Sequence, residues 1–348
     1  MKINKIYQVF KLLFKITGHD RKIDSYFRLQ DFASTLDQLH FDSRDISSED
    51  KNRFFKNQLE EIEMETHGYC NRKCEFCPNY SIDRTDKNQI LPEQVFKQLI
   101  DELSQINFCG TLKFHRYNEP LALDIIFDRI SYARKKLSNA ILGLHSNGDY
   151  VTYDVLRKCE HEGLDFLYIS RYVDFNIPNG NFKKIAKEHC EDYLNKKELN
   201  GKHILRENNL ARYMIPMKKM RVIIFVPDIV NHGDDRGGFL ELLRREDIRT
   251  SPCISPFRRM YIDWTGDVLP CCNLRGDIDT HKDYIMGNIK SATLQDIFFS
   301  KASNRIRKML LDFSEKQGSC KYCKFDLFCS SDKAKKLMDE QSKRHACK

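Results

Sequence analysis

Apolar residues recur at helical spacing near the start of the chain. The pattern consists of Ile3, Ile6, Tyr7, Phe10, Leu13 and Phe14, with lysines between them. This period predicts an amphipathic helix, because positions three and four apart share one helix face. We expect the helix to pack on the main domain, and the alternative is a basic helix on a membrane surface or a partner. Residues 44–51 are polar and predict a linker, so residues 1–57 are expected to form a helical N-terminal extension.

From residue 58 onward, short apolar runs alternate with helical patterns. The runs predict strands at 61–65, 111–115, 140–146, 164–170 and 221–226. Helices are predicted between them at 92–106, 121–137, 152–163 and 182–199. Repeated strand–helix units predict an α/β fold with a parallel sheet, either open or barrel-like. Functional side chains in barrel folds lie at the carboxyl ends of the strands, so residues 58–250 are expected to carry the main site.

The pattern changes again after residue 250. Met260, Ile262 and Trp264 alternate with polar residues, and a Thr265-Gly266 turn leads back to apolar positions. This alternation around a turn predicts a β-hairpin. Two short helices are predicted at 293–299 and 303–311, followed by a tail rich in Cys and Lys. Residues 251–348 are therefore expected to form a second, smaller domain.

Composition narrows the class of protein. The chain has 348 residues, 41% of them hydrophobic, which excludes a disordered or collagenous protein. Its net charge of +8 fits an anionic ligand without arguing for nucleic acid. The longest strongly apolar run, 222–226, is too short to span a membrane, and lysines interrupt the N-terminus where a secretory signal needs an apolar stretch. We therefore expect a cytoplasmic protein, in which the 13 cysteines serve as metal ligands or catalytic thiols more readily than as disulfides.

A first cysteine cluster follows the first predicted strand. Cys70, Cys74 and Cys77 form a C-x3-C-x2-C loop, and three thiolates at this spacing can wrap one soft metal centre. Three protein ligands leave one iron of a four-iron cluster open to another molecule. A zinc site would need a fourth ligand, for which His67 is the local candidate.

A second set of cysteines lies in the C-terminal domain. It comprises Cys253, Cys271 and the C-x2-C pair Cys320 and Cys323, followed by Cys329 and Cys347. A hairpin with a distant C-x2-C pair also describes a zinc ribbon, so zinc remains an alternative here. Cys272 neighbours Cys271, and side chains of adjacent extended residues point to opposite faces. Cys272 is then either a buried residue that only packs in the core or a thiol that faces the active site. Cys109, Cys159 and Cys190 are expected to be structural thiols.

The first cluster resembles the radical S-adenosylmethionine (radical SAM) superfamily, whose signature is C-x3-C-x-aromatic-C with Phe76 at the aromatic position. The resemblance implies a partial (β/α)6 TIM-like barrel. It also implies a 4Fe–4S cluster that is held by the three cysteines and binds SAM, which is cleaved to a 5′-deoxyadenosyl radical that abstracts hydrogen from substrate. Further residues that resemble the family's SAM-binding segments follow later strands: Asn118-Glu119-Pro120, where Asn replaces a family Gly, Ser146-Asn147-Gly148, and Ser170-Arg171.

The second half resembles the SPASM and shorter twitch extensions of radical SAM enzymes. In the twitch form, one auxiliary 4Fe–4S cluster takes the cysteines that correspond to Cys253, Cys271, Cys320 and Cys323. The full SPASM form has a second cluster, and Lys333 stands where one of its cysteines belongs. We expect one auxiliary cluster, held by these four cysteines or by the set Cys320, Cys323, Cys329 and Cys347.

The resemblance implies an oxidoreductase or epimerase that needs an external one-electron donor, such as flavodoxin or ferredoxin. The expected substrate is a small molecule such as a sugar, aminocyclitol or nucleoside derivative, because the N-terminus lacks the strands of peptide-recognition domains. The alternatives are a maturase of a ribosomally made peptide or protein, and a non-catalytic iron–sulfur or zinc protein. Dehydrogenation uses the auxiliary cluster as electron acceptor, whereas epimerisation needs a thiol hydrogen donor, for which Cys272 is the candidate. Arg116 and Arg171 lie near strand ends and are candidates for contact with a phosphate, and the alternatives are SAM binding or a solvated face.

Overall fold

The computed structural model describes residues 29, 30, 32, 33, 47–173, 181–204, 212–325, 327, 328 and 332–346. The apolar pattern at residues 3–14, and with it the predicted N-terminal helix, lies outside these residues. Cys329 and Cys347 also lie outside them. Among the described residues, no helix combines the length and the apolar character that a membrane span requires.

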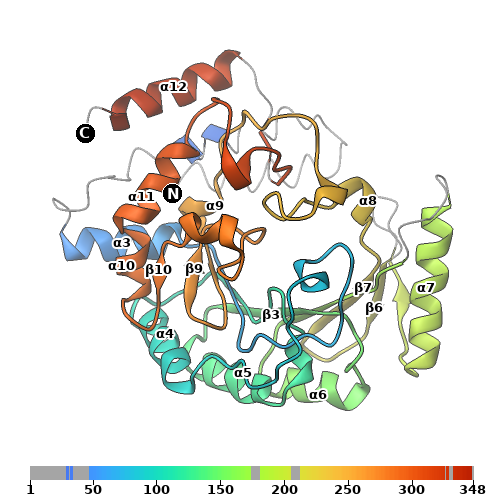
Figure 1. The fold of residues 1–348 in the computed structure, drawn as a ribbon. Helices are drawn as coiled ribbons and strands as arrows, with labels where there is room; N and C mark the ends of the chain where they lie inside the picture. Colours follow the sequence, from blue (N-terminus) through green and yellow to red (C-terminus); the bar gives the residue numbers. More distant parts are fainter. Residues whose placement is uncertain are drawn as a thin grey trace.

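A ten-stranded sheet is the centre of the molecule (Figure 1). Its strands, in sheet order, are β10 (Gly287–Asn288), β9 (Asp267–Leu269), β8 (Arg259–Ile262), β1 (Glu61–Met64), β2 (Thr111–Lys113), β3 (Ile141–Ser146), β4 (Phe166–Ser170), β7 (Arg221–Phe225), β6 (Arg212–Ile215) and β5 (Lys202–His203). The run from β8 through β1 to β7 is parallel, and the two strands at each edge pair antiparallel. The predicted α/β fold with a partial barrel is therefore confirmed.

Helices follow the strands and cover the outside of the sheet. The α-helices are α3 (Ser48–Gln58), α4 (Glu93–Gln105), α5 (Ile125–Lys136), α6 (Tyr153–His161), α7 (Phe182–Lys196), α8 (Ile229–His232), α9 (Ser255–Arg258), α10 (Leu294–Phe298), α11 (Lys301–Met309) and α12 (Asp332–Ala346). Short 3-10 helices lie at Pro78–Tyr80, Pro120–Ala122, Glu241–Leu243, Asp279–Tyr284 and Gly318–Cys320. Helix α6 illustrates the local signals, because Thr152 caps its first turn by accepting from Val155 N and Gly163 follows its end with a φ of +96°.

The polar segment that predicted a linker at 44–51 is in fact the start of α3, as far as it is described. Ser47 caps the helix by accepting a hydrogen bond from Asp50 N, and acidic residues in the first turn favour the helix dipole. The helix buries Phe54 and Phe55, and Phe55 meets Phe298 at a ring-centroid distance of 5.2 Å. The linker prediction was wrong because polar residues at a helix start were interpreted as a loop.

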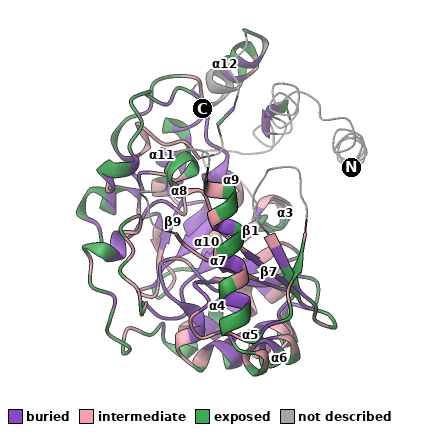
Figure 2. Cartoon of the chain, turned by 90° about the vertical axis from the view of Figure 1, so that its right-hand side faces the viewer, coloured by how far each residue is buried: buried purple, intermediate pink, exposed green. Residues whose placement is uncertain are grey.

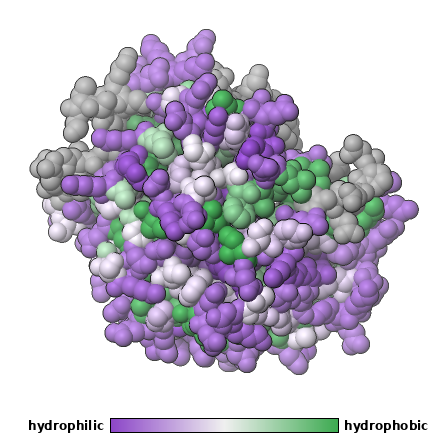
Figure 3. Space-filling model, in the orientation of Figure 1, coloured by the Kyte–Doolittle hydropathy of each residue, from purple (hydrophilic) through white to green (hydrophobic). Residues whose placement is uncertain are grey.

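The predicted hairpin of β8 and β9 does not build a separate sheet. Strand β8 pairs in parallel with β1, from Glu61 opposite Arg259 to Met64 opposite Ile262, and thereby continues the sheet of the barrel. Figure 2 shows buried residues along the strands and exposed residues on the outward faces of the helices. The face shown in Figure 3 is mostly hydrophilic, with scattered hydrophobic residues. The core thus runs without interruption from the barrel into the C-terminal part.

Candidate active site

A cavity of about 330 Å³ opens at the carboxyl ends of the parallel strands. Its wall combines the cysteine loop after β1 with the segments that follow β2, β3 and β4, and Arg236 and Cys272 complete it. The predicted site residues that line it are Cys70, Cys74, Phe76, Cys77, Asn118, Glu119, Ser146, Asn147, Ser170 and Cys272. Pro120 and Arg171 are not among the lining residues. One cavity therefore gathers most of the motif residues, which are far apart in the sequence.

Glu119 holds two walls of the cavity together. Its carboxylate accepts hydrogen bonds from Ser146 Oγ at 2.8 Å, Asn147 N at 2.7 Å and Leu121 N at 3.2 Å. Its own backbone N donates to Tyr69 O in the cysteine loop. Burial raises the pKa of Glu119 to about 7, although these donors favour the charged form. Glu119 thus fixes the segment after β3 against the segment after β1.

A second set of polar contacts fixes the segment of residues 147–149. Asn147 Nδ2 donates to Asn71 Oδ1 at 2.8 Å, and Arg72 Nε donates to Asp149 Oδ2 at 2.7 Å. Arg171 Nη1 donates to Asn147 O at 2.7 Å and lies 3.4 Å from Asp149 Oδ1. Arg171, predicted to contact SAM directly, therefore acts on the segment that carries Asn147.

The three cysteines of the first cluster border the same cavity. Burial raises the pKa of Cys70 to about 12 and that of Cys74 to about 11, so a thiolate at these positions needs a cation beside it. Backbone N–H groups two residues onward hydrogen-bond to Cys70 and to Cys77. No three His, Cys, Asp or Glu side chains among the described residues gather tightly enough to hold one metal ion. Thiols spread around a common cavity suit a larger cluster better than a zinc ion, and His67 does not line the cavity.

The C-terminal cysteines form a second group. Cys253 is close enough to Cys320 and Cys323 for a negative charge on its thiol to raise the pKa of each. Charges on Cys253 and Cys323 raise the pKa of Cys271 in the same way. Asn273 N donates to Cys271 Sγ at 3.4 Å, and Phe325 N donates to Cys323 Sγ at 3.3 Å. Such N–H···S bonds stabilise thiolates that hold iron–sulfur clusters.

Arg249 lies beside this second group. Its Nη1 lies 3.5 Å from Cys323 Sγ and donates to Phe325 O, and its Nε donates to Ser251 O. A buried guanidinium at this place offsets the negative charge that several thiolates would bring. Donors and charge in this group therefore fit an auxiliary cluster.

Cys272 faces the cavity, in agreement with one of the two roles expected for it. Residues 270–272 lie outside β9, and the thiols of Cys271 and Cys272 hydrogen-bond to each other rather than pointing fully apart. This hydrogen bond, with the charge of Arg236, lowers the pKa of Cys272 despite its burial. Only Cys272 of the pair lines the cavity.

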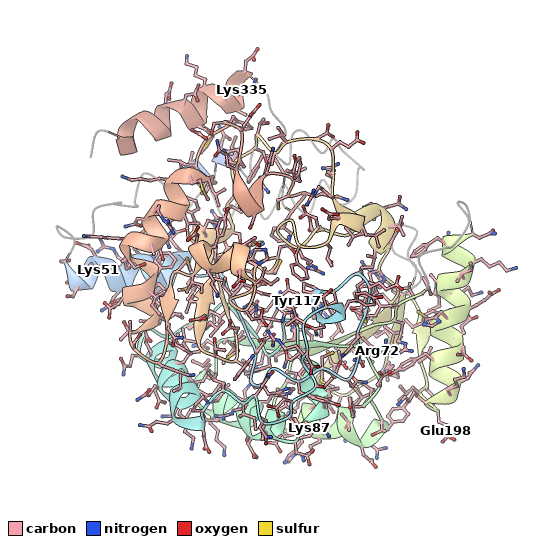
Figure 4. All side chains as sticks on the ribbon, in the orientation of Figure 1. Lys51, Arg72, Lys87, Tyr117, Glu198 and Lys335 are labelled. Carbon is pink, nitrogen blue, oxygen red and sulfur yellow. The ribbon has the colours of Figure 1, made fainter. Side chains whose placement is uncertain are left out.

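Three contacts bring the segment around Cys272 onto the barrel. Tyr117 Oη donates to Cys272 O at 2.7 Å, and Arg116 Nη2 donates to Leu274 O at 2.6 Å. Arg275 Nη1 donates to Asn79 Oδ1 at 2.6 Å in the cysteine loop. Tyr117 and Arg72, both labelled in Figure 4, come from the loops after β2 and β1. The C-terminal part thus supplies one wall of the cavity.

Sequence reasoning missed several lining residues: Glu63, Arg72, His115, Tyr117 and Arg236. Glu63 carried a signal, because a charged residue inside a buried strand needs a polar partner or a function. Arg72 lies within the cysteine loop, and this position in the sequence already indicates that it is close to the site. Arg236 follows no motif, and only the tertiary structure brings it to the cavity.

The cavity and the two cysteine groups can be compared with known proteins. Residues 64–171 match the model of the radical SAM superfamily, and residues 253–324 match the SPASM model, described as an iron–sulfur cluster-binding domain. A radical SAM domain uses a 4Fe–4S cluster and SAM, and a SPASM domain holds auxiliary iron–sulfur clusters.

Two curated relatives align over most of the chain. One is the S-adenosyl-L-methionine-dependent 2-deoxy-scyllo-inosamine dehydrogenase of Niallia circulans, 25% identical over 75% of this chain and 91% of that relative. The other is a tungsten-containing aldehyde ferredoxin oxidoreductase cofactor-modifying protein of Pyrococcus furiosus, 20% identical over 68% of this chain and 80% of that relative.

Among solved structures, the fold is similar to that of BtrN in complex with AdoMet and 2-DOIA. The TM-score is 0.56 at 21% identity, and the match covers 78% of this chain and 96% of that structure. The fold, the cysteine loop at the mouth of the barrel and the two family matches lead to one assignment. The chain belongs to the radical SAM superfamily and carries a SPASM domain after its partial barrel.

Proposed function

We propose that this radical SAM oxidoreductase dehydrogenates a secondary alcohol of a small polyol substrate. The observation that carries the proposal is the shared cavity, which joins the cysteine loop to Glu63 and to the C-terminal part. The Niallia circulans relative is named a dehydrogenase of an inosamine, and we extend to this chain the oxidation of a polyhydroxylated small molecule. A peptide or protein substrate remains the alternative.

Within this proposal, Cys70, Cys74 and Cys77 hold the SAM-binding cluster. When bound, the cluster and SAM supply a radical that abstracts a hydrogen atom. Glu119 and Asn147 shape the SAM-binding wall, and Asn118 Nδ2 is a buried donor with no hydrogen-bond partner among the described residues, available to a SAM oxygen.

The auxiliary cluster is assigned to Cys253, Cys271, Cys320 and Cys323. The mutual proximity of these cysteines and the N–H···S bonds to Cys271 and Cys323 support this set, whereas Cys329 and Cys347 lie outside the described residues. An external one-electron donor, such as a flavodoxin or a ferredoxin, completes the system. Free thiols and iron–sulfur clusters suit a reducing compartment, and we therefore propose a cytoplasmic location.

Conversion of a secondary alcohol to a ketone removes one hydrogen atom, one proton and one electron, so the site needs a proton acceptor. Glu63 is the candidate, because it lines the cavity and its side chain is only 11% exposed. Burial raises its pKa to about 7, which suits a group that takes up a proton near neutral pH. Its carboxylate lies 3.6 Å from Lys113 Nζ, which also bridges to Glu61 at 2.6 Å. Glu63, Lys113 and Glu61 thus form a row of charged groups from the cavity toward the first residue of β1.

Several other groups face Glu63, and they set how it titrates. They are His115, whose Nε2 lies 3.9 Å away and which burial keeps neutral, Arg116, Tyr261 and Cys272. Arg116 and Lys113 favour the charged carboxylate, whereas Glu61 opposes it. Burial raises the pKa of Glu63 by more than Arg116 and Lys113 lower it.

Epimerisation is the second candidate, and the thiol of Cys272 at the cavity supports it. The two outcomes separate when the reaction is run in deuterated water. Dehydrogenation gives a product oxidised by two electrons with no deuterium fixed at carbon. Deuterium at one carbon of an isomer, lost in Cys272→Ala, would replace dehydrogenation by epimerisation. A modified peptide in place of a small-molecule product would overturn the substrate class.

A further inference from the structure

Two guanidinium groups in the cavity wall have N–H groups that no protein atom uses. Arg116 donates Nη2 to Leu274 O, but its buried Nε and Nη1 have no hydrogen-bond partner among the described residues. Arg236 donates Nη1 to Asn273 Oδ1 at 2.9 Å, and its buried Nε has none. Asn273 Nδ2 is a further buried donor without a partner in the described part of the chain.

Other arginines of this region are paired with carboxylates. Arg72 pairs with Asp149, Arg84 Nη1 lies 3.2 Å from Glu65 Oε2, and Arg275 pairs with Asp277. Within the described residues, Arg116 and Arg236 form no such ion pair. Buried charged donors are costly to leave without an acceptor, so unpaired ones at a cavity point to an anionic ligand.

Neighbouring rings hold the two guanidinium groups in place. The Tyr117 ring centroid lies 5.8 Å from Arg116 Cζ and 5.9 Å from Arg236 Cζ. The Tyr261 ring centroid also lies 5.7 Å from Arg116 Cζ. Both cations thus lie within range of one aromatic ring, which fixes them without consuming their N–H groups.

A carboxylate of the protein also borders the cavity. Glu63 interacts with Lys113, and it makes no ion pair with Arg116 within 4 Å. The two arginines therefore keep donors free for a ligand while Glu63 stays engaged with Lys113.

We propose that Arg116 and Arg236, with Asn273, bind an anionic group of the substrate, a phosphate or a carboxylate. Guanidinium forks match the oxygens of both groups. The substrate is then an acidic polyol, such as a sugar phosphate or a uronic acid, rather than a neutral or cationic cyclitol. This inference rests on the proposed function, because it specifies the substrate of the same cavity.

The test is calorimetric titration of inorganic phosphate, and separately of acetate, into the anaerobically reconstituted holoenzyme saturated with SAM. Saturation with SAM removes its own carboxylate as a competitor for the site. We expect saturable binding of at least one anion, weakened about tenfold or more in the Arg116→Gln/Arg236→Gln variant. Tighter phosphate binding indicates a phosphorylated substrate, and tighter acetate binding indicates a carboxylated one. Arg221→Gln, at the opposite end of β7, is the matched control and should bind like the wild type.

A second measurement covers the case in which the double variant does not fold. Phenylglyoxal modification of the wild type, mapped by peptide mass, should be suppressed by the bound anion at Arg116 and Arg236 but not at Arg221. Absence of saturable binding, or equal protection at all three arginines, would overturn the inference. Wild-type cleavage of SAM to 5′-deoxyadenosine without any anion tests the proposed function separately. Cleavage without anion binding defeats only the inference, and absence of cleavage defeats the proposed function.

Discussion

Replacing Glu119 by Gln should weaken SAM binding more than it weakens the fold. The carboxylate accepts from Ser146 Oγ and Leu121 N on one oxygen and from Asn147 N on the other. An amide keeps one oxygen only, so its NH2 group must face one of these donors. The Asn147 segment can relax in the free enzyme, but the bound state requires it in place.

The expected size of the effect follows from these contacts. Leaving one buried donor without an acceptor costs about 1–3 kcal/mol. If that loss falls on the bound state, the Kd for SAM rises about 5- to 150-fold. The measurement belongs at pH 8 to 8.5, because burial raises the pKa of Glu119 to about 7 and the carboxylate must be ionised in the wild type.

Equilibrium dialysis of SAM against the reconstituted holoenzyme provides the assay, with urea unfolding measured in parallel. Glu102→Gln is the matched control, because Glu102 accepts from Leu294 N and Gln295 N, both at 2.9 Å, at the start of α10. The control should lose stability and keep its Kd for SAM. A Kd in Glu119→Gln within twofold of the wild type, or an equal rise in the control, would refute the reasoning.

Three further predictions concern the fold, the second cluster and the proton acceptor. Gly143→Ala should destabilise the barrel by about 1–3 kcal/mol in urea unfolding, because an added Cβ would lie 2.0 Å from the Phe166 ring; Phe166→Leu in that background should recover part of the loss, and unchanged stability would contradict the packing. Cys320→Ala should lower the iron content from about eight to about four atoms per chain, and an unchanged content would remove Cys320 from the ligand set. The turnover of wild-type enzyme should rise with pH through about 7, because Glu63 accepts a proton only when ionised; Glu63→Gln should lose turnover together with this limb, and an identical profile in the variant would exclude Glu63.

Much of the barrel could be predicted from local signals. Apolar runs such as Val222–Val226 and helix signals such as Thr152 and Gly163 act within a few residues of the chain, and the structure places strands and helices there. Strands β5 and β6 were missed because they are short and form by pairing at the edge of the sheet. The parallel pairing of β8 with β1 joins segments almost 200 residues apart, and no local pattern encodes such a partner.

The residues of the candidate site also fall into two groups, those that a local sequence pattern identifies and those that only the tertiary structure brings together. The cysteine loop was found because cluster ligands require a fixed spacing, and the segments around Glu119 and Asn147 were found because they resemble family segments that follow strands. Arg116 was noticed by its position at a strand end, but its unused donors are visible only in the packed structure. Arg236 carried no signal, since its place in the cavity depends on contacts with the C-terminal part.

The most direct test of the assignment is the release of 5′-deoxyadenosine from SAM by the reconstituted enzyme with dithionite under anaerobic conditions. The wild type should release it, and Cys74→Ala should not, because Cys74 is an assigned ligand of the SAM-binding cluster. Cys109→Ala, a change at an exposed thiol just before β2, should cleave SAM like the wild type. Release by Cys74→Ala at the wild-type rate, or none from a wild-type enzyme that holds its full iron, would contradict the account.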